Sequence, residues 1–239
     1  MDGFTYTNIF DTKGIEYLII IAFLLLIIPY WIAINKPFKI KEKIGEALGI
    51  LSENILRIPL GLFYSKNHTW THLEKSGKAL VGLDDLLVHL TGKAELSILR
   101  NPGEHVSKGD FIAVINQEGK HLNIASPISG EIQNVNALLK KQTDAIHEDP
   151  YGKGWLYKIK PDNWVAETNT CFMANEAIAW TKHELARFKD FIASSISKNS
   201  PETAYAILQE GGELIDNPLA GLPEETWRDF QSEFLDEMS

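Results

Sequence analysis

The sequence is poor in residues that build covalent or metal-held frameworks. Its 239 residues include one cysteine, Cys171, and three methionines. A single cysteine excludes a disulfide framework within the chain and a thiolate metal cluster. His68 and His72 are four residues apart but lie in a strand-like stretch, where that spacing does not build the two-ligand face that it gives on a helix. We therefore expect no metal site.

Basic residues are also in the minority. Lys and Arg number 23 against 32 Asp and Glu, which leaves a formal net charge of −9. A nucleic-acid partner normally requires a basic face on the protein. The charge balance therefore predicts that no nucleic acid is bound.

The chain also lacks the sequence patterns of a self-contained enzyme. It has no Ser-His-Asp arrangement, no phosphate-binding glycine loop and no carboxylates at metal-ligand spacing. The paired acids Asp84-Asp85 and Glu224-Glu225 are typical of solvated surface charge. We expect a protein without catalytic residues.

Charge disappears completely between residues 17 and 34, which form the most apolar run of the chain. A helix of this length, at about 1.5 Å per residue, just spans a hydrocarbon core of about 30 Å. Tyr17, Tyr30 and Trp31 lie near its ends, where aromatic belts form. A cleaved signal peptide fits poorly, because the preceding segment is acidic and no small-residue cleavage site follows. The run predicts a transmembrane helix over residues 17–34.

Lysines are distributed unequally around this run. Lys36, Lys39, Lys41 and Lys43 follow it, whereas only Lys13 precedes it. The positive-inside rule then places residues 1–16 outside and the rest of the chain in the cytoplasm. We expect a single-pass protein of the cell (inner) membrane with a cytoplasmic main domain.

The next segment, residues 35–58, has the pattern of an amphipathic linker helix. Its apolar residues recur at spacings of three and four, as in Ile44, Leu48, Leu51 and Ile55. Such a helix either lies on the membrane surface or packs against the domain or a partner subunit.

Residues 59–164 change to short β-like runs broken by glycine, such as Phe111-Ile112-Ala113-Val114-Ile115. This spacing predicts a mainly β sandwich or barrel.

Residues 165–239 form a tail with helical, acidic character. Near its end, four apolar side chains recur at helical spacing among acids: Trp227, Phe230, Phe234 and Leu235. Aromatic residues at such spacing favour docking into a groove, and we expect this tail to dock onto a partner rather than onto its own domain.

Six motifs stand in order within the β-like region, at residues 64–71, 81–92, 102–109, 127–132, 134–138 and 148–155. The most specific are Pro127-Ile128-Ser129-Gly130 and the run from Glu148 to Trp155, in which two glycines, a proline and two aromatic residues recur together. The series resembles the glycine cleavage H-protein, a β-rich carrier that holds lipoate on a lysine at a hairpin tip. The resemblance covers roughly residues 64–162 and implies a barrel-sandwich hybrid of two small sheets.

The resemblance also locates the carrier lysine. In this family it lies eight residues before the proline of the Pro-x-Ser-Gly motif and ten after the glycine that ends the preceding turn. Counted from Pro127 or from Gly109, that position is Gly119, and Lys120 follows one place late. Neighbouring side chains in a hairpin point to opposite faces, so Lys120 does not replace a lysine at the tip. We expect no cofactor, with lipoate on Lys120 as the alternative.

Together these patterns favour a non-catalytic, membrane-anchored accessory subunit that docks onto a larger membrane complex, with a redox complex as the expected partner. One alternative is a tethered lipoyl carrier related to the glycine cleavage system. Another is a transport adaptor of the membrane-fusion type. Such adaptors carry a long helical insertion, and residues 109–127 leave no room for one.

Overall fold

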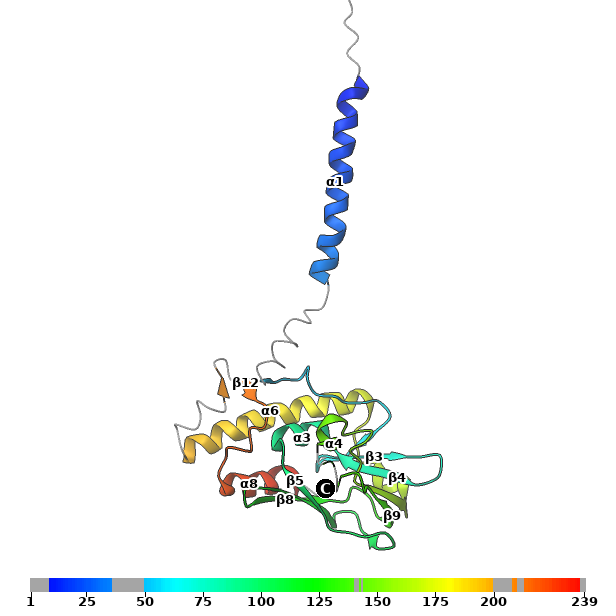
Figure 1. The fold of residues 1–239 in the computed structure, drawn as a ribbon, viewed down its shortest axis with the longest axis vertical. Helices are drawn as coiled ribbons and strands as arrows, with labels where there is room; N and C mark the ends of the chain where they lie inside the picture. The colour runs from blue at the N-terminus through cyan, green and yellow to red at the C-terminus, as the bar shows by residue number, and fades with distance from the viewer. Residues whose placement is uncertain are drawn as a thin grey trace, which may run out of the picture. The chain divides into compact units, whose positions relative to one another are not determined.

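The computed structural model describes residues 9–35, 50–139, 142, 144–199, 208–209 and 213–236. The chain divides into two compact units, Met1–Ile44 and Gly45–Ser239. Each unit is a separate body, drawn with its described elements in Figure 1.

The first unit contains one long helix, α1 (Ile9–Asn35), with Pro29 inside it. Its apolar side chains are exposed, as Leu18 and Leu26 illustrate at 67% and 70%. Within the described part of the chain, no helix is both long and apolar enough to cross a membrane.

Two sheets form the body of the second unit. The larger sheet has six strands in the order β2-β3-β4-β10-β9-β6, and all its pairings are antiparallel. Its strands are β2 (Phe63–Tyr64), β3 (Thr69–Leu73), β4 (Ala79–Leu83), β6 (His105–Val106), β9 (Gly130–Val135) and β10 (Tyr157–Pro161). The smaller sheet has the order β5-β7-β8, with β5 (Glu95–Ile98), β7 (Phe111–Gln117) and β8 (Lys120–Ala125). The prediction of a mainly β, barrel-sandwich domain is confirmed.

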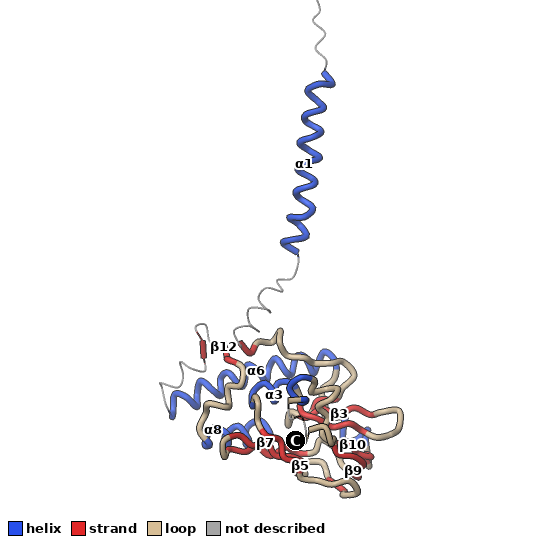
Figure 2. Tube along the Cα trace, in the orientation of Figure 1, coloured by secondary structure: helices blue, strands red, loops and turns tan. Residues whose placement is uncertain are grey.

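Helices pack around these sheets. They are α3 (Asp85–Thr91), α4 (Ala145–Glu148), α5 (Trp164–Thr168), α6 (Ala174–Asn199), α8 (Glu224–Phe230) and the π-helix η1 (Gln231–Leu235). Figure 2 shows α6 and α3 above the strands and α8 beside the smaller sheet. The helix α3 starts where Asp84 caps it, its side chain accepting the Leu87 N–H at 2.8 Å. An N-cap of this kind stabilises a short helix by about 1 kcal/mol.

A third, small sheet has the order β1-β12-β11 and joins distant segments. Its strands are β1 (Ile50–Leu51), β11 (Leu208–Gln209) and β12 (Glu213–Ile215). The predicted linker helix is therefore wrong at its C-terminal end, because Leu51 pairs as a strand with Leu214 and both are buried. Residues 36–49 of that prediction lie outside the described residues. The tail is likewise not helical throughout, since β11 and β12 lie within it.

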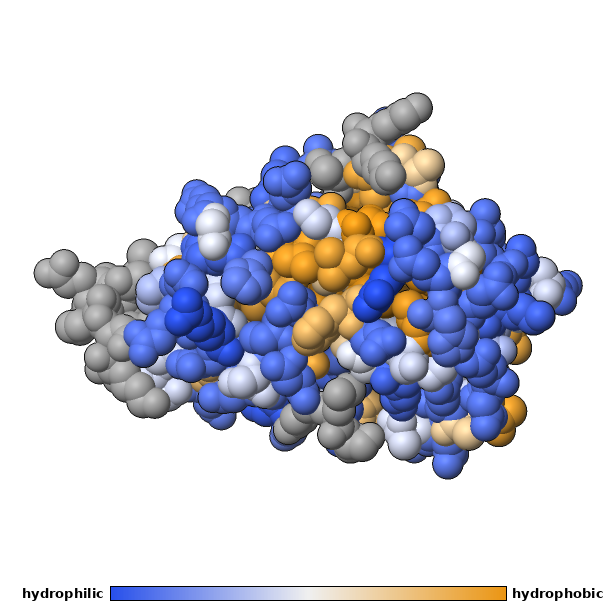
Figure 3. Space-filling model, turned by 90° about the horizontal axis from the view of Figure 1, so that it is seen from below, coloured by the Kyte–Doolittle hydropathy of each residue, from blue (hydrophilic) through white to orange (hydrophobic). Residues whose placement is uncertain are grey.

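One buried core runs through the sheets, α3, α6 and the C-terminal helices. A second, smaller cluster surrounds Tyr64 and Trp70. Figure 3 shows one face where apolar side chains gather in the middle with polar ones around them.

Candidate functional site

The β7–β8 hairpin, which the family resemblance makes the carrier hairpin, turns through Glu118 and Gly119. Their φ angles are 51° and 84°, and the strands close with Gln117 paired to Lys120. Two positive φ values in a two-residue loop are typical of a type I′ turn, whose second position favours glycine. The residue at the predicted carrier position is thus a turn glycine without a side chain.

Lys120 begins β8, and its side chain contacts the C-terminal region. The Nζ donates to the carbonyl oxygens of Ala220 at 2.7 Å and Leu222 at 3.1 Å. It also lies 5.3 Å from the ring centroid of Trp227. The amine thus has two carbonyl acceptors and an aromatic ring as neighbours. Lys120 is therefore half-buried and engaged inside its own chain.

The aromatic residues of the tail pack internally. Trp227 and Phe230 are 0% exposed, Phe234 is 1% and Leu235 is 2%. Trp227 donates its Nε1–H to the Leu219 carbonyl at 2.8 Å. This corrects the prediction that these four residues dock onto a partner: the groove they fill is formed by the chain's own α6 and β8.

The π-helix η1 also contacts β8 through a side-chain amide. Gln231 accepts the Asn123 N–H at 2.8 Å and donates to the Asn123 carbonyl at 3.2 Å. β8 is the outer strand of its sheet, so this amide takes the place that a neighbouring strand would occupy. Figure 1 shows α8 alongside the hairpin strands.

The Pro-x-Ser-Gly motif serves to fix the chain after β8. Ser129 donates from its N–H and its hydroxyl to the Glu167 carboxylate, at 2.8 and 2.5 Å. A β-carbon at Gly130, where φ is 155°, would overlap the Lys160 carbonyl oxygen. The motif therefore marks a close backbone approach between β9 and β10.

The run from Glu148 to Trp155 forms a turn held by its own aspartate. Asp149 accepts the N–H groups of Gly152 and Lys153, at 2.8 and 3.1 Å. Asn136 donates its amide to the Lys153 and Trp155 carbonyls, at 2.8 and 2.7 Å. This family motif is thus structural in the present chain.

Three ionisable side chains meet in the interior, and the sequence patterns did not reveal them as a group. His68 Nδ1 lies 2.8 Å from Asp84 Oδ2, and His68 Nε2 lies 3.7 Å from Glu184 Oε2. All three residues are at most 4% exposed. The cluster links the start of β3, the N-cap of α3 and the middle of α6.

These neighbours set the charge of His68. Burial alone would lower the pKa of His68, but the charge and hydrogen bond of Asp84, together with Glu184, outweigh burial and raise the pKa to about 9. Burial would raise the pKa of Glu184, yet His68 and Arg187 hold it below its ordinary value. The cluster is therefore a buried cation between two carboxylates, fully enclosed and without access for a substrate.

The paired acids Asp84 and Asp85 are not solvated, contrary to the sequence prediction. They are 2% and 1% exposed. Asp85 accepts the backbone N–H of Arg57 at 2.7 Å and lies 3.1 Å from its guanidinium. Glu224 and Glu225 are exposed, as predicted.

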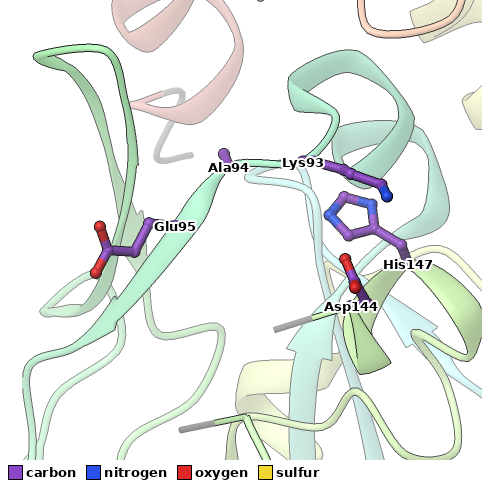
Figure 4. A pocket seen from close by; sticks show the side chains of 5 residues that line it. All are labelled: Lys93, Ala94, Glu95, Asp144 and His147. Carbon is purple, nitrogen blue, oxygen red and sulfur yellow. The ribbon is translucent and has the colours of Figure 1, made fainter. Parts of the chain in front are cut away.

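A cavity of about 330 Å³ opens between the start of β5 and α4, lined by Lys93, Ala94, Glu95, Asp144 and His147. Figure 4 shows Lys93 and Asp144 on either side of the His147 ring, while Glu95 points away. Burial lowers the pKa of His147, aided by the positive charges of His89 and Lys93. Charges of both signs in an open cavity favour no single ligand class, and in the described ranges no three His, Cys, Asp or Glu side chains are grouped to hold a metal ion.

Comparison with known proteins gives one consistent family. A family model described as glycine cleavage H-protein matches residues 62–184. The glycine cleavage system H protein of Psychrobacter cryohalolentis is 34% identical over 119 residues, covering 50% of this chain and 94% of the relative. That of Aeromonas hydrophila is 38% identical over 106 residues, covering 44% and 82%.

One solved structure is also similar to part of the chain. The H protein from Mycobacterium marinum is 26% identical, with a TM-score of 0.46, and covers 52% of this chain and 98% of its own. The family model alone spans half of the chain and includes the hairpin, the Pro-x-Ser-Gly motif and the first part of α6. The chain belongs to the glycine cleavage H-protein family.

Proposed function

We propose that this protein is an unlipoylated, non-catalytic scaffold subunit that docks its H-protein domain onto a larger membrane complex, with a redox complex as the expected partner. The observation that supports the proposal most directly is that the β7–β8 hairpin has no free lysine at its tip. Gly119 occupies the turn, and the amine of Lys120 is bound to the Ala220 and Leu222 carbonyls.

The contacts of Lys120 oppose its use as a carrier. Attachment of lipoate requires a neutral amine that is free to attack an activated carboxyl group, and the thioester or phosphoanhydride partner must reach it. The Lys120 amine instead donates hydrogen bonds to two carbonyls of its own chain, so it is not free to meet such a partner. An acylated lysine has one N–H and no charge, so it does not satisfy both carbonyls.

Mass spectrometry of the protein from its native source tests the proposal. We expect Lys120 to be unmodified, and an octanoyl or lipoyl adduct on Lys120 would overturn it. A reaction with a lipoate–protein ligase gives a matched comparison. Gly119→Lys places an amine at the tip and should be modified, whereas wild type and Lys120→Ala should both remain unmodified.

A tethered lipoyl carrier is the second candidate function, favoured by membership of a family whose relatives are named as glycine cleavage system H proteins. The same ligase reaction separates the two functions. Modification of wild type at Lys120, lost in Lys120→Ala, supports the carrier.

We also place the protein at a membrane through residues 17–34, with residues 1–16 outside and the main domain in the cytoplasm. The support is the uncharged run and the exposure of its side chains, because solvent-exposed apolar surface of this extent requires a cover. The full chain should stay with the membrane pellet after extraction at alkaline pH, and a variant lacking residues 1–35 should not. Release of the full chain by alkaline extraction would contradict this attachment, and protease access in inverted vesicles tests its orientation.

A further inference from the structure

Residues 213–222 connect three elements that are far apart in the sequence. The segment begins in β12, which pairs with β1 through Ile50–Ile215 and Leu51–Leu214. Leu51 and Leu214 are 1% and 0% exposed, so this pairing is also a core contact. β1 is the first described element after α1 along the chain.

The segment next runs along α3. The Asn217 N–H donates to the His89 carbonyl at 3.0 Å, and the Leu219 N–H donates to the Leu90 carbonyl at 3.1 Å. Asp216 accepts from His89 Nδ1 at 2.8 Å. These bonds satisfy carbonyls at the C-terminal end of α3 that have no partner within the helix.

The segment ends at the hairpin. The carbonyls of Ala220 and Leu222 hold the Lys120 amine, and Leu222 is 4% exposed. The ten residues are thus tied at β1, at α3 and at β8, with at most two residues between successive ties. Because these contacts are so close together along the chain, breaking the contacts at one site strains the contacts at the next.

We propose that residues 213–222 are a strap through which the pairing of β1 with β12 controls access to the Lys120 amine. When the strap is in place, the Lys120 amine is half-buried and is bound to the Ala220 and Leu222 carbonyls. When a partner takes β1 out of its pairing, the strap loosens and the amine becomes exposed together with the Asn123 edge of β8. This proposal depends on the proposed function in one respect: Lys120 must be unmodified.

Amine acetylation of the full chain measures this coupling. A brief pulse of acetyl N-hydroxysuccinimide ester is followed by peptide mass spectrometry, with exposed Lys75 as the internal reference. The neutral amine attacks the ester carbonyl, an amide bond forms, N-hydroxysuccinimide leaves and the proton passes to the buffer. In wild type, Lys120 should react at least about ten times more slowly than Lys75.

Leu51→Ala loosens β1 without touching Lys120 and should raise the Lys120-to-Lys75 ratio at least about fivefold. Leu62→Ala is the matched control, because Leu62 belongs to the separate Tyr64–Trp70 cluster. Asp216→Asn weakens the strap without removing core volume, and it should also raise the ratio.

An unchanged ratio in both Leu51→Ala and Asp216→Asn would overturn the strap, as would an equal rise in Leu62→Ala, which would indicate global opening. An adduct found on Lys120 before labelling contradicts the proposed function instead. The two failures are therefore distinguishable.

Discussion

His68 is a buried cation that contacts two buried carboxylates, those of Asp84 and Glu184. Replacing it with glutamine removes the cation and leaves Asp84 and Glu184 facing each other in the interior. Breaking a buried pair of this kind costs about 3–5 kcal/mol. Urea unfolding of His68→Gln at pH 7 should show such a loss. His105→Gln breaks the exposed pair with Asp162 and should cost less than about 1 kcal/mol.

The same residue predicts a pH dependence. The pKa of His68 is about 9 in the folded protein against an ordinary value of 6.5, so the folded state binds the proton more tightly. The stabilisation is therefore complete below about pH 6.5 and is lost as the pH rises through about 9. The difference in unfolding free energy between wild type and His68→Gln should be largest near pH 6 and should shrink toward pH 10. A constant difference across this range would show that His68 is neutral in the fold.

Gly130 gives a steric prediction. Gly130→Ala places a β-carbon against the Lys160 carbonyl, whereas Gly103→Ala, also at positive φ, meets nothing within 4 Å. Gly103→Ala should cost only the backbone strain of about 1 kcal/mol, and Gly130→Ala should cost several times more. Thermal unfolding of the two variants measures the difference. Equal losses would mean that β9 and β10 separate easily at this point.

The residues that could be predicted have contacts close to them in the sequence, whereas those that were missed have contacts with residues far along the chain. Gly119 and Gly130 follow from local turn geometry and from motif spacing, so their positions could be predicted. The burial of Asp84 depends on His68 and on Glu184, which is 100 positions further along the chain. No local pattern reports such a contact, and two adjacent acids therefore suggested surface charge.

Among the elements, α8 and η1 are helical as predicted, but they pack onto their own chain and not onto a partner. The helical spacing of their aromatic residues was visible in the sequence, but spacing does not tell whether the receiving groove belongs to a partner or to the same chain. Likewise, Leu51 fits a helical pattern and becomes a strand because β12 lies beside it. Tertiary contacts override local preference in such short segments.

Internal packing of the tail has a measurable cost. Trp227→Ala removes a fully buried indole and its hydrogen bond to Leu219, and it should destabilise the isolated chain by about 3–5 kcal/mol. Phe111→Ala, at a side chain that is 44% exposed, is the control and should cost much less. If thermal unfolding of Trp227→Ala matched wild type, the tail would contribute nothing to the isolated fold.

At the scale of the whole molecule, the division at Gly45 predicts independent folding. A chain that starts at Gly45 keeps all described contacts of the second unit, so its unfolding midpoint should equal that of the full chain in the same detergent. Removing residues 224–239 as well should lower the midpoint, because this takes Trp227, Phe230 and Phe234 from the core. A lower midpoint for the first truncation alone would show that residues 1–44 stabilise the domain.

The amide of Gln231 has a consequence for solubility. An outer strand with free N–H and carbonyl groups is a template for pairing with another chain, and β8 would be such a strand without η1. By meeting Asn123 with both of its polar atoms, one glutamine ends the sheet where a second molecule would otherwise extend it. A protein clipped before η1 should therefore self-associate through β8, and the intact tail keeps the hairpin of each molecule apart from that of its neighbours.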